Sequence, residues 1–386
     1  MTDMETAHLA PATNFDQALQ EALGIAALSP SSHNCQPWAL AQLTSAPARA
    51  AAAAMVRLAE TGDHTYLALA LDRERELRAL PAHAVEMWVS CGLYWGFLSW
   101  ALEALGWDAA RTTILDQHGA ADARAVPGWP PSWSPLAAAA FARSDRPTDP
   151  GVAARLRAVA LARRTNRGPY RELPVDPVLL HRLANRPGRA ITVTHLRTTD
   201  ERAAFADAVA QHGGRDFAHP EAWRETYSYL RWNEADADAH SDGFTLGQLF
   251  GPVSAIRRGL MRAAFTPTVM RDLRYVGYHR TLAQRLAQVV RQTPAAVAIG
   301  VEDPRPGQAD LVRAGAALAD YWLDVTRAGL ALHPISVVLQ HDDVRRQLQA
   351  ALGLPGRTIL IARLGYPATE FPRSPRRAAA APLREF

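Results

Sequence analysis

The sequence replays one order of helix and strand patterns twice, and this internal repeat constrains the fold more than any other feature. In the first half, the periodicity predicts helices at about 15–28, 47–60 and 82–105 and strands at Trp38–Leu43, Tyr66–Leu71 and near 111–115 and 136–142. The second half predicts helices at about 152–162, 176–185, 200–211 and 309–328 and strands at Ile191–Leu196, Ala295–Val301 and Thr358–Leu364. A repeat of this size indicates that each half is one structural unit.

Helices mixed with strands in both halves predict an α+β fold. We expect residues 1–150 to form the first repeat and residues 151–386 the second, joined as an intrachain pseudo-dimer. The chain has no glycine-rich strand–turn–helix segment, which argues against a Rossmann domain.

An insertion at about 213–292 has no counterpart in the first half. It carries several large aromatic residues, namely Trp223, Tyr227, Tyr229, Trp232, Phe244 and Phe250. Aromatic surface and glycine hinges suit a lid that closes over a flat ligand. The alternative is that these aromatics pack the insertion into the body or into a dimer contact.

Composition excludes several classes of function. The chain contains no lysine, so Schiff-base chemistry and a Walker-type phosphate loop are excluded. The net charge is only +4 and arginines alternate with acids, so we expect no nucleic-acid partner. No apolar run reaches the roughly 18 residues of a membrane span, and the N-terminal residues do not resemble a signal peptide. We therefore expect a cytoplasmic protein without a membrane partner.

The segment Ser29–Trp38, with the sequence SPSSHNCQPW, lies between a predicted helix and a predicted strand. It is dense in short polar side chains and exposed backbone N–H groups, and its Pro-Trp pair anchors it to the core. Such a loop suits a polar heterocycle that needs several hydrogen bonds. The alternative is a turn in which serine and asparagine satisfy free backbone groups.

A second segment, Arg163–Arg167 with the sequence RRTNR, follows a short helix. Three arginines and one hydroxyl suit a phosphate, because guanidinium groups pair bidentately with phosphate oxygens. The alternative is a helix C-terminus whose arginines offset the helix dipole.

A third segment, Ala328–Ser336, follows the second long helix, and its glycine turn can present backbone N–H groups to a ligand. We expect His333 to be a hydrogen-bonded structural residue. A charged helix, the sequence LGLP and a strand ending in LGYP come next, followed by Arg373, Arg376 and Arg377.

Taken in order, these segments resemble the nitroreductase-like superfamily of FMN-binding proteins. SPSSHNCQPW is similar to the loop that one subunit of those homodimers offers to its partner's FMN. RRTNR is similar to their phosphate-binding signature. The resemblance extends to the Acg-like branch, in which two such repeats are fused and a lid lies over the flavin, and it covers about residues 15–370.

The two motifs are divided between the halves. The first half has the loop and no arginine before Arg49, whereas the second half has the arginine signature without a following loop of that type. Each subunit of the homodimers carries both motifs. The division predicts one composite FMN site per chain, so that a monomer suffices for the site, and further homodimerisation stays open.

The resemblance assigns the FMN contacts to particular residues. The phosphate would be held by Arg163, Thr165 and one of Arg373, Arg376 or Arg377, with Asn166 in the same segment. Arg167 would lie at the N1 and O2 edge of the ring, where positive charge favours the reduced anion. Ser336 and Val337, preceded by Pro334 and Ile335, would lie near N5. The other half would contribute Pro30, Ser31, Ser32, Asn34 and Gln36.

These assignments imply an FMN-dependent oxidoreductase. NAD(P)H or another donor would pass a hydride to the flavin, which would then act on a small organic substrate, while the protein orients the reactants. No metal is needed and no general base is identified. Cys35 and Ser336 depart from residues common in relatives and leave the activity open. The alternatives are a protein that sequesters FMN beneath a lid without turnover, and catalysis on FMN itself, for which no acidic motif is present.

Overall fold

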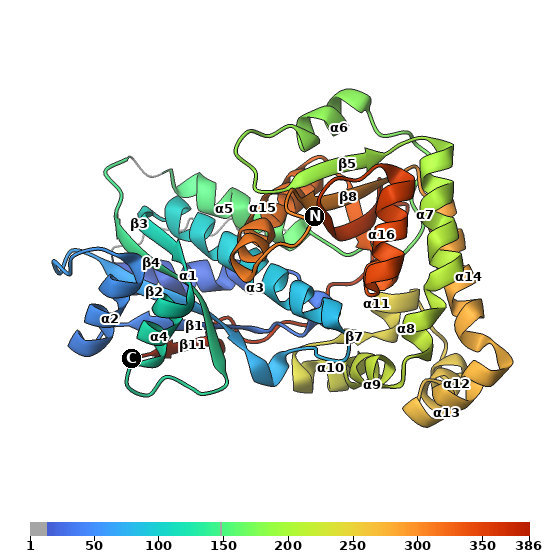
Figure 1. Ribbon diagram of the computed structural model, residues 1–386, viewed down its shortest axis with the longest axis horizontal. Coiled ribbons are helices and arrows are strands. Elements are labelled where there is room, and N and C mark those ends of the chain that lie inside the picture. Colours follow the sequence, from blue (N-terminus) through green and yellow to red (C-terminus); the bar gives the residue numbers. More distant parts are fainter. Residues whose placement is uncertain (1–13, 147–148) are drawn as a thin grey trace, which may run out of the picture.

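The computed structural model describes residues 14–146 and 149–386 (Figure 1). Its α-helices are α1 Phe15–Ala26, α2 Ala46–Val56, α3 Pro81–Ala104, α4 Gln117–Arg124, α5 Pro150–Ala162, α6 Pro177–Ala184, α7 Thr199–His212, α8 Gly214–Ala218, α9 Pro220–Ser228, α10 Glu234–His240, α11 Leu246–Phe250, α12 Ala255–Ala264, α13 Pro267–Leu273, α14 Tyr278–Arg291, α15 Gln308–Arg327 and α16 Asp342–Leu352. Short 3-10 helices are η1 Ser32–Asn34, η2 Arg73–Arg75, η3 Arg274–Val276 and η4 Ser336–Val338. The strands are β1 Trp38–Leu43, β2 Thr65–Asp72, β3 Trp107–Ile114, β4 Trp133–Arg143, β5 Thr192–Leu196, β6 Leu230–Arg231, β7 Phe244–Thr245, β8 Ala295–Val301, β9 Ala331–Pro334, β10 Arg357–Gly365 and β11 Leu383–Glu385.

Two predictions from the sequence concern a signal peptide and a membrane-spanning segment. The N-terminal residues considered for a signal peptide fall mostly within residues 1–13, outside the described part. Within the described part, none of the helices has both the length and the apolar character needed to cross a membrane.

The two main sheets have the same internal strand order. The first has the order β11-β1-β2-β4-β3 and the second β5-β8-β10-β9. Within these two sheets, all neighbouring strands are antiparallel apart from the parallel pair of β11 and β1. A separate two-stranded sheet pairs β6 with β7 in parallel. In each sheet the long helix, α3 or α15, connects a central strand to the edge strand β3 or β9. Antiparallel sheets combined with these helices confirm the predicted α+β class.

The long helices α3 and α15 cross at two glycines. A Cβ atom at Gly92 would lie 2.1 Å from the carbonyl oxygen of Val312, and one at Gly315 would lie 2.3 Å from that of Val89. Gly92 of α3 therefore faces the carbonyl group three residues before Gly315, and Gly315 of α15 faces the carbonyl group three residues before Gly92. Such a reciprocal pair of contacts is typical of two elements related by a two-fold axis. Only glycine allows backbones to approach this closely. The two-repeat organisation remains a proposal, and this contact supports it.

The largest hydrophobic core is shared by both halves of the chain. It contains Tyr94 and Phe97 of α3, Leu318 and Tyr321 of α15 and Val297 of β8, all fully buried. The C-terminal strand also joins the halves, because β11 pairs with β1 in the first sheet (Figure 1). The halves therefore bury their apolar surface together.

The insertion, from α8 to α14, has a small core of its own. Trp223, Phe244 and Phe265 are buried in it, together with Leu230, Leu246 and Met270. The Trp223 indole N–H donates to the Phe265 carbonyl oxygen at 2.8 Å. Most of the aromatics therefore pack within the insertion itself, whereas the alternative to the lid placed them against the body or in a dimer contact, and Phe250 is 45% exposed.

Candidate functional site

A pocket at the junction of the two halves brings together four segments that are far apart in the sequence. It is lined by the loop after α1, the segment after α5, Phe244 of β7 and the C-terminal segment at 372–376. The predicted site residues that line it are Pro30, Ser31, Asn34, Arg163, Thr165, Arg167, Arg373 and Arg376. Residues from both halves thus form one composite pocket.

Arg163 is buried beneath this pocket without a counter-charge. Its side chain is 6% exposed, and its guanidinium lies 5.2 Å from the centre of the Trp322 ring. One amino group donates to the Leu28 carbonyl oxygen at 3.3 Å, whereas Nε and Nη1 have no partner among the described residues. Burial, reinforced by Arg376 and Arg164, holds its pKa well below the usual range. A buried unpaired cation is costly, and an anion in the pocket would offset that cost.

Arg376 brings a second incompletely paired guanidinium to the same pocket. It donates to the side-chain oxygen of Asn34 at 2.5 Å, while its Nε has no partner among the described residues. Burial lowers its pKa to about 10, so it stays cationic at neutral pH. Neither Arg163 nor Arg376 forms an ion pair within the described part of the chain. Two such cations from separate segments match the charge of a phosphate.

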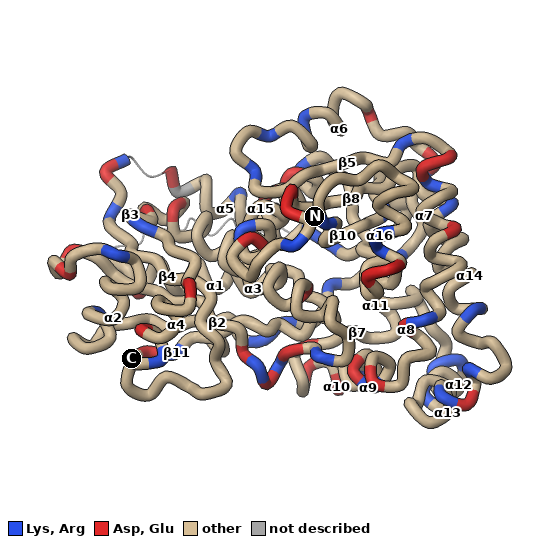
Figure 2. Tube along the Cα trace, in the orientation of Figure 1, with Lys and Arg blue, Asp and Glu red and all other residues tan. Residues whose placement is uncertain are grey.

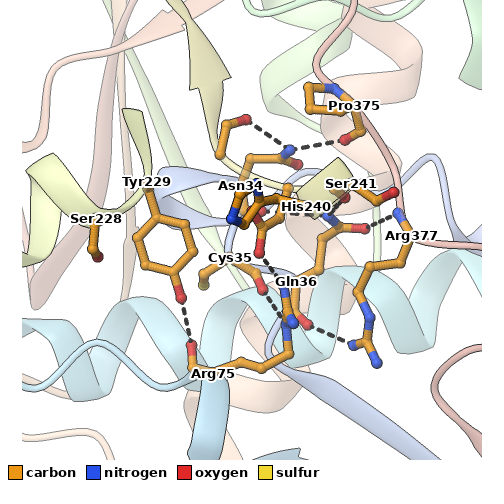
Figure 3. Close-up of polar contacts among 12 residues, drawn as sticks. Asn34, Cys35, Gln36, Arg75, Ser228, Tyr229, His240, Ser241, Pro375 and Arg377 are labelled. Atoms are coloured by element: carbon orange, nitrogen blue, oxygen red, sulfur yellow. Dashed lines mark hydrogen bonds and ion pairs between the residues drawn. The ribbon is translucent and has the colours of Figure 1, made fainter. Parts of the chain in front are cut away.

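Asn34 and Gln36 tie the insertion and the C-terminal segment to the first half (Figure 3). The Asn34 amide donates to the carbonyl oxygens of Gly243 and Pro375 at 2.9 and 2.8 Å. The Gln36 amide donates to the Ser241 carbonyl oxygen at 2.9 Å, and its side-chain oxygen accepts from the backbone N–H of Arg377 at 3.0 Å. Gln36 is buried and does not line the pocket. It acts on the site through the segments that it joins.

The loop that contains Asn34 and Gln36 has an unusual backbone. His33, Asn34 and Gln36 have φ values of 49°, 53° and 51°, in the left-handed region that non-glycine residues seldom occupy. Such conformations persist when the surrounding structure holds them, and they cluster at ligand sites. Ser31 contributes to this support, because its hydroxyl oxygen accepts from the Gln36 N–H at 2.9 Å.

Asp242 forms two ion pairs at the base of the insertion, with Arg75 and Arg231, and we call these three residues the latch. Asp242 is buried and pairs with Arg75 of the first half at 2.5 Å and also with Arg231 of β6. The Arg75 Nε donates to the Cys35 carbonyl oxygen at 2.8 Å (Figure 3). Sequence analysis missed this latch, because Arg75 lies in a run of alternating charges that is typical of a solvated surface.

Several predicted contacts lie outside the pocket lining. Asn166 is buried and closes its own loop, since its side-chain oxygen accepts from the Gly168 N–H at 2.8 Å and its amide donates to the Thr369 carbonyl oxygen at 2.6 Å. The segment Pro334–Val337 runs from β9 into η4, where the Ile335 N–H donates to the Ile361 carbonyl oxygen at 2.8 Å. These residues therefore hold the backbone near the pocket through hydrogen bonds and do not line the pocket themselves.

His333 has the structural role expected from the sequence. Its Nδ1 lies 3.1 Å from an Nη1 of Arg363, which is also buried and lies over the Tyr170 ring at 4.4 Å. Burial and two nearby arginines hold the His333 pKa well below its usual range, so the imidazole is neutral. Arg363 was missed, because one arginine in a strand pattern gives no signal of burial.

A half-buried carboxyl group lies beside the pocket. Glu86 of α3 accepts hydrogen bonds from the Ser32 hydroxyl at 2.5 Å and the Gln340 amide at 2.6 Å. Burial raises the Glu86 pKa, and burial lowers that of the neighbouring His33 to about 4. Because Ser32 Oγ also lies 3.1 Å from His33 Nδ1, a hydrogen-bonded chain connects the carboxyl group to a pocket-lining imidazole. This chain can carry a proton toward the pocket.

An α+β fold with an arginine-lined pocket between two halves fits the nitroreductase-like class. No protein-family model matches the chain. A curated protein from Serratia sp., described as "Probable NAD(P)H nitroreductase PigM", is 32% identical over 370 residues, which cover 94% of this chain and 92% of that protein. The chain belongs to the nitroreductase family, which confirms the resemblance to that superfamily, and the assignment to the branch with two fused repeats stays a prediction.

One solved structure supports the same fold over nearly the whole chain, and a second is similar over part of it. A putative nitroreductase from Anabaena variabilis superposes with a TM-score of 0.50 over 93% of this chain and 90% of that one, at 10% identity. A second structure is the FMN-dependent nitroreductase NfnB from Mycobacterium smegmatis, solved in complex with NADPH. Its superposition includes 58% of this chain and 95% of the NfnB chain, with 15% sequence identity and a TM-score of 0.33. The first superposition extends over nearly the whole chain.

Proposed function

We propose that the protein is an FMN-dependent oxidoreductase that takes reducing equivalents from NAD(P)H and passes them to a small organic acceptor. The observation that carries this proposal is the buried, incompletely paired guanidinium of Arg163 at the junction of the halves. Membership of the nitroreductase family supports it, as does the description of the Serratia relative as an NAD(P)H nitroreductase.

The pocket residues divide into two groups by their chemistry. Arg163, Arg376 and Thr165 would hold the phosphate, because unpaired N–H groups and a hydroxyl match its oxygens. Arg167 lies 5.6 Å from the centre of the Phe244 ring and donates to the Gln248 carbonyl oxygen at 3.3 Å. Its pKa is lowered to about 10 by burial, so it remains a cation that would favour an anionic reduced ring. FMN, when bound, supplies the redox chemistry.

The chain's own residues would position the reactants and manage protons. Phe244 and the backbone around Asn34 exclude water from one side of the pocket. Glu86, Ser32 and His33 would supply or accept the proton that accompanies two-electron transfer to an organic acceptor. The acceptor would be a small molecule. Proton transfer to this acceptor would need no general base with a high pKa.

The composite pocket predicts the flavin content of the purified protein. We expect a yellow protein that releases FMN, and not FAD, on denaturation, at about one flavin per chain, because only one junction pairs the loop with the arginine segment. NADPH added without oxygen should bleach the flavin, and an organic acceptor should restore its colour. Absorbance and chromatography of the released flavin measure this, and FAD or two flavins per chain would contradict the composite site.

The second candidate function is flavin sequestration without turnover, and the latch of Asp242 favours it. Replacing Arg75 by alanine removes one arm of the latch while Arg231 still pairs with Asp242. If the insertion limits access, the variant should keep its flavin and be reduced several times faster by dithionite in stopped-flow absorbance. Arg73→Ala, an exposed neighbour in the same turn, is the control. A variant that keeps its flavin but is reduced no faster than this control would remove the support for sequestration.

A further inference from the structure

The outer surface of the insertion, at α12 and η3, exposes large apolar side chains. Ile256 and Leu260 of α12 are 80% and 68% exposed, and Tyr275 and Val276 of η3 are 76% and 78% exposed. No side chain of α12 is buried. We call these four side chains, with the arginines among them, the α12 patch. Large apolar side chains with this exposure in one short part of the chain indicate an interaction surface.

Helix geometry gives the patch a defined polarity. Ile256 and Leu260 are four residues apart and therefore lie on one face of α12. At 3.6 residues per turn, Arg257 borders this face, whereas Arg262 lies further around the helix and Arg258 lies on the side opposite the apolar face. An apolar stripe on a helix whose polar surface is rich in arginine is typical of a helix that lies in the interface of a bilayer.

Basic charge is concentrated in the same segment. Residues 251–290 contain seven arginines and a single acid, Asp272, whereas the rest of the chain has 35 arginines and 37 acids. The positive net charge of the protein therefore comes from this segment. Arg257, Arg258 and Arg262 form no ion pair with any described residue. Figure 2 shows the basic residues of α12 and α13 gathered at one extremity of the molecule.

We propose that the α12 patch docks the protein peripherally onto an anionic phospholipid surface. The arginines match the charge of the headgroups, and the aliphatic side chains can enter the headgroup region. A second copy would place arginines opposite arginines, and a nucleic acid offers no apolar partner for Ile256 and Leu260. The sequence pattern predicts no membrane partner, because no apolar segment is long enough to span a bilayer and a single helical turn of apolar residues is too short to stand out.

The test is flotation of the intact protein with vesicles. Binding to vesicles that contain phosphatidylglycerol is expected at low salt, with weaker binding as salt rises and none to pure phosphatidylcholine. Replacing Arg257, Arg258 and Arg262 by glutamine should lower the partition coefficient by on the order of 100-fold. Ile256→Ser with Leu260→Ser should lower it by about tenfold or more.

A matched control separates the patch from net charge. Arg111, Arg124 and Arg182 are exposed elsewhere on the molecule, and replacing them by glutamine removes the same charge. This control should bind anionic vesicles almost as well as the parent, and all variants should keep the parent's circular dichroism. The proposal is overturned if the parent does not bind anionic vesicles, if the two triple variants lose binding equally, or if α12 instead mediates self-association or binding to DNA or an acidic protein.

Discussion

Replacing Arg163 by alanine is expected to lower the affinity for FMN by about one to two orders of magnitude. A charge-assisted bond to a phosphate contributes about 1.5–3 kcal/mol, and Arg163 has two N–H positions without a protein partner. Isothermal titration of the flavin-free protein measures the change. Arg73→Ala, from an exposed mixed-charge turn, is the control and should leave the affinity unchanged, so equal losses in both variants would refute the phosphate assignment.

The same residue gives a second readout that does not depend on flavin. A buried unpaired guanidinium destabilises the empty protein, and its neighbours Arg164 and Arg376 add repulsion. Arg163→Met keeps most of the side-chain volume and removes the charge. This variant should therefore bind FMN weakly and yet unfold at higher denaturant concentration than the parent when both are flavin-free. Loss of stability in the empty variant would mean that Arg163 serves the fold and not a ligand.

Substituting alanine at Gly92 or at Gly315 is expected to destabilise the protein by about 3 kcal/mol or more. A new Cβ at either position would lie more than 1 Å inside normal contact with a backbone carbonyl oxygen, at 2.1 or 2.3 Å, and a helix backbone cannot move aside alone. Denaturant unfolding followed by circular dichroism measures the loss. The double variant should lose less than the sum, because the first substitution already separates α3 from α15.

Gly24→Ala provides the control for these glycines. Gly24 also lies in a helix, α1, but a Cβ there would meet nothing within 4 Å. Alanine is a better helix former than glycine, so this variant should be as stable as the parent or slightly more stable. A loss at Gly24 as large as that at Gly92 would mean that the close helix crossing is not what makes the glycines necessary.

Local sequence patterns were sufficient for most of the secondary structure. The strands at Trp38–Leu43 and Ala295–Val301 have the bounds predicted, and α3 and α15 agree with prediction to within one residue at each end. These elements are long or almost wholly apolar, so their periodicity is clear. The short strand β11 was missed, since three residues near a chain end carry no periodicity and form a strand only because β1 offers a free edge.

The sequence by itself predicted the family, the α+β class and three of the segments that meet at the pocket, because those properties follow from local periodicity and from motifs of fixed spacing. It also placed Pro334–Val337 at the site, and that segment does not line the pocket. Only the tertiary structure decided what each polar side chain does. Arg163 and Arg363 are both buried without an ion pair among the described residues, yet Arg163 has two N–H positions without a partner, whereas Arg363 donates to Thr293 and Gly168. Asn34 lines the pocket, whereas Gln36, two residues later, holds the surrounding segments together. The physical reason is that the partners of a buried polar group come from distant parts of the chain, and packing alone sets which of them are within hydrogen-bonding distance.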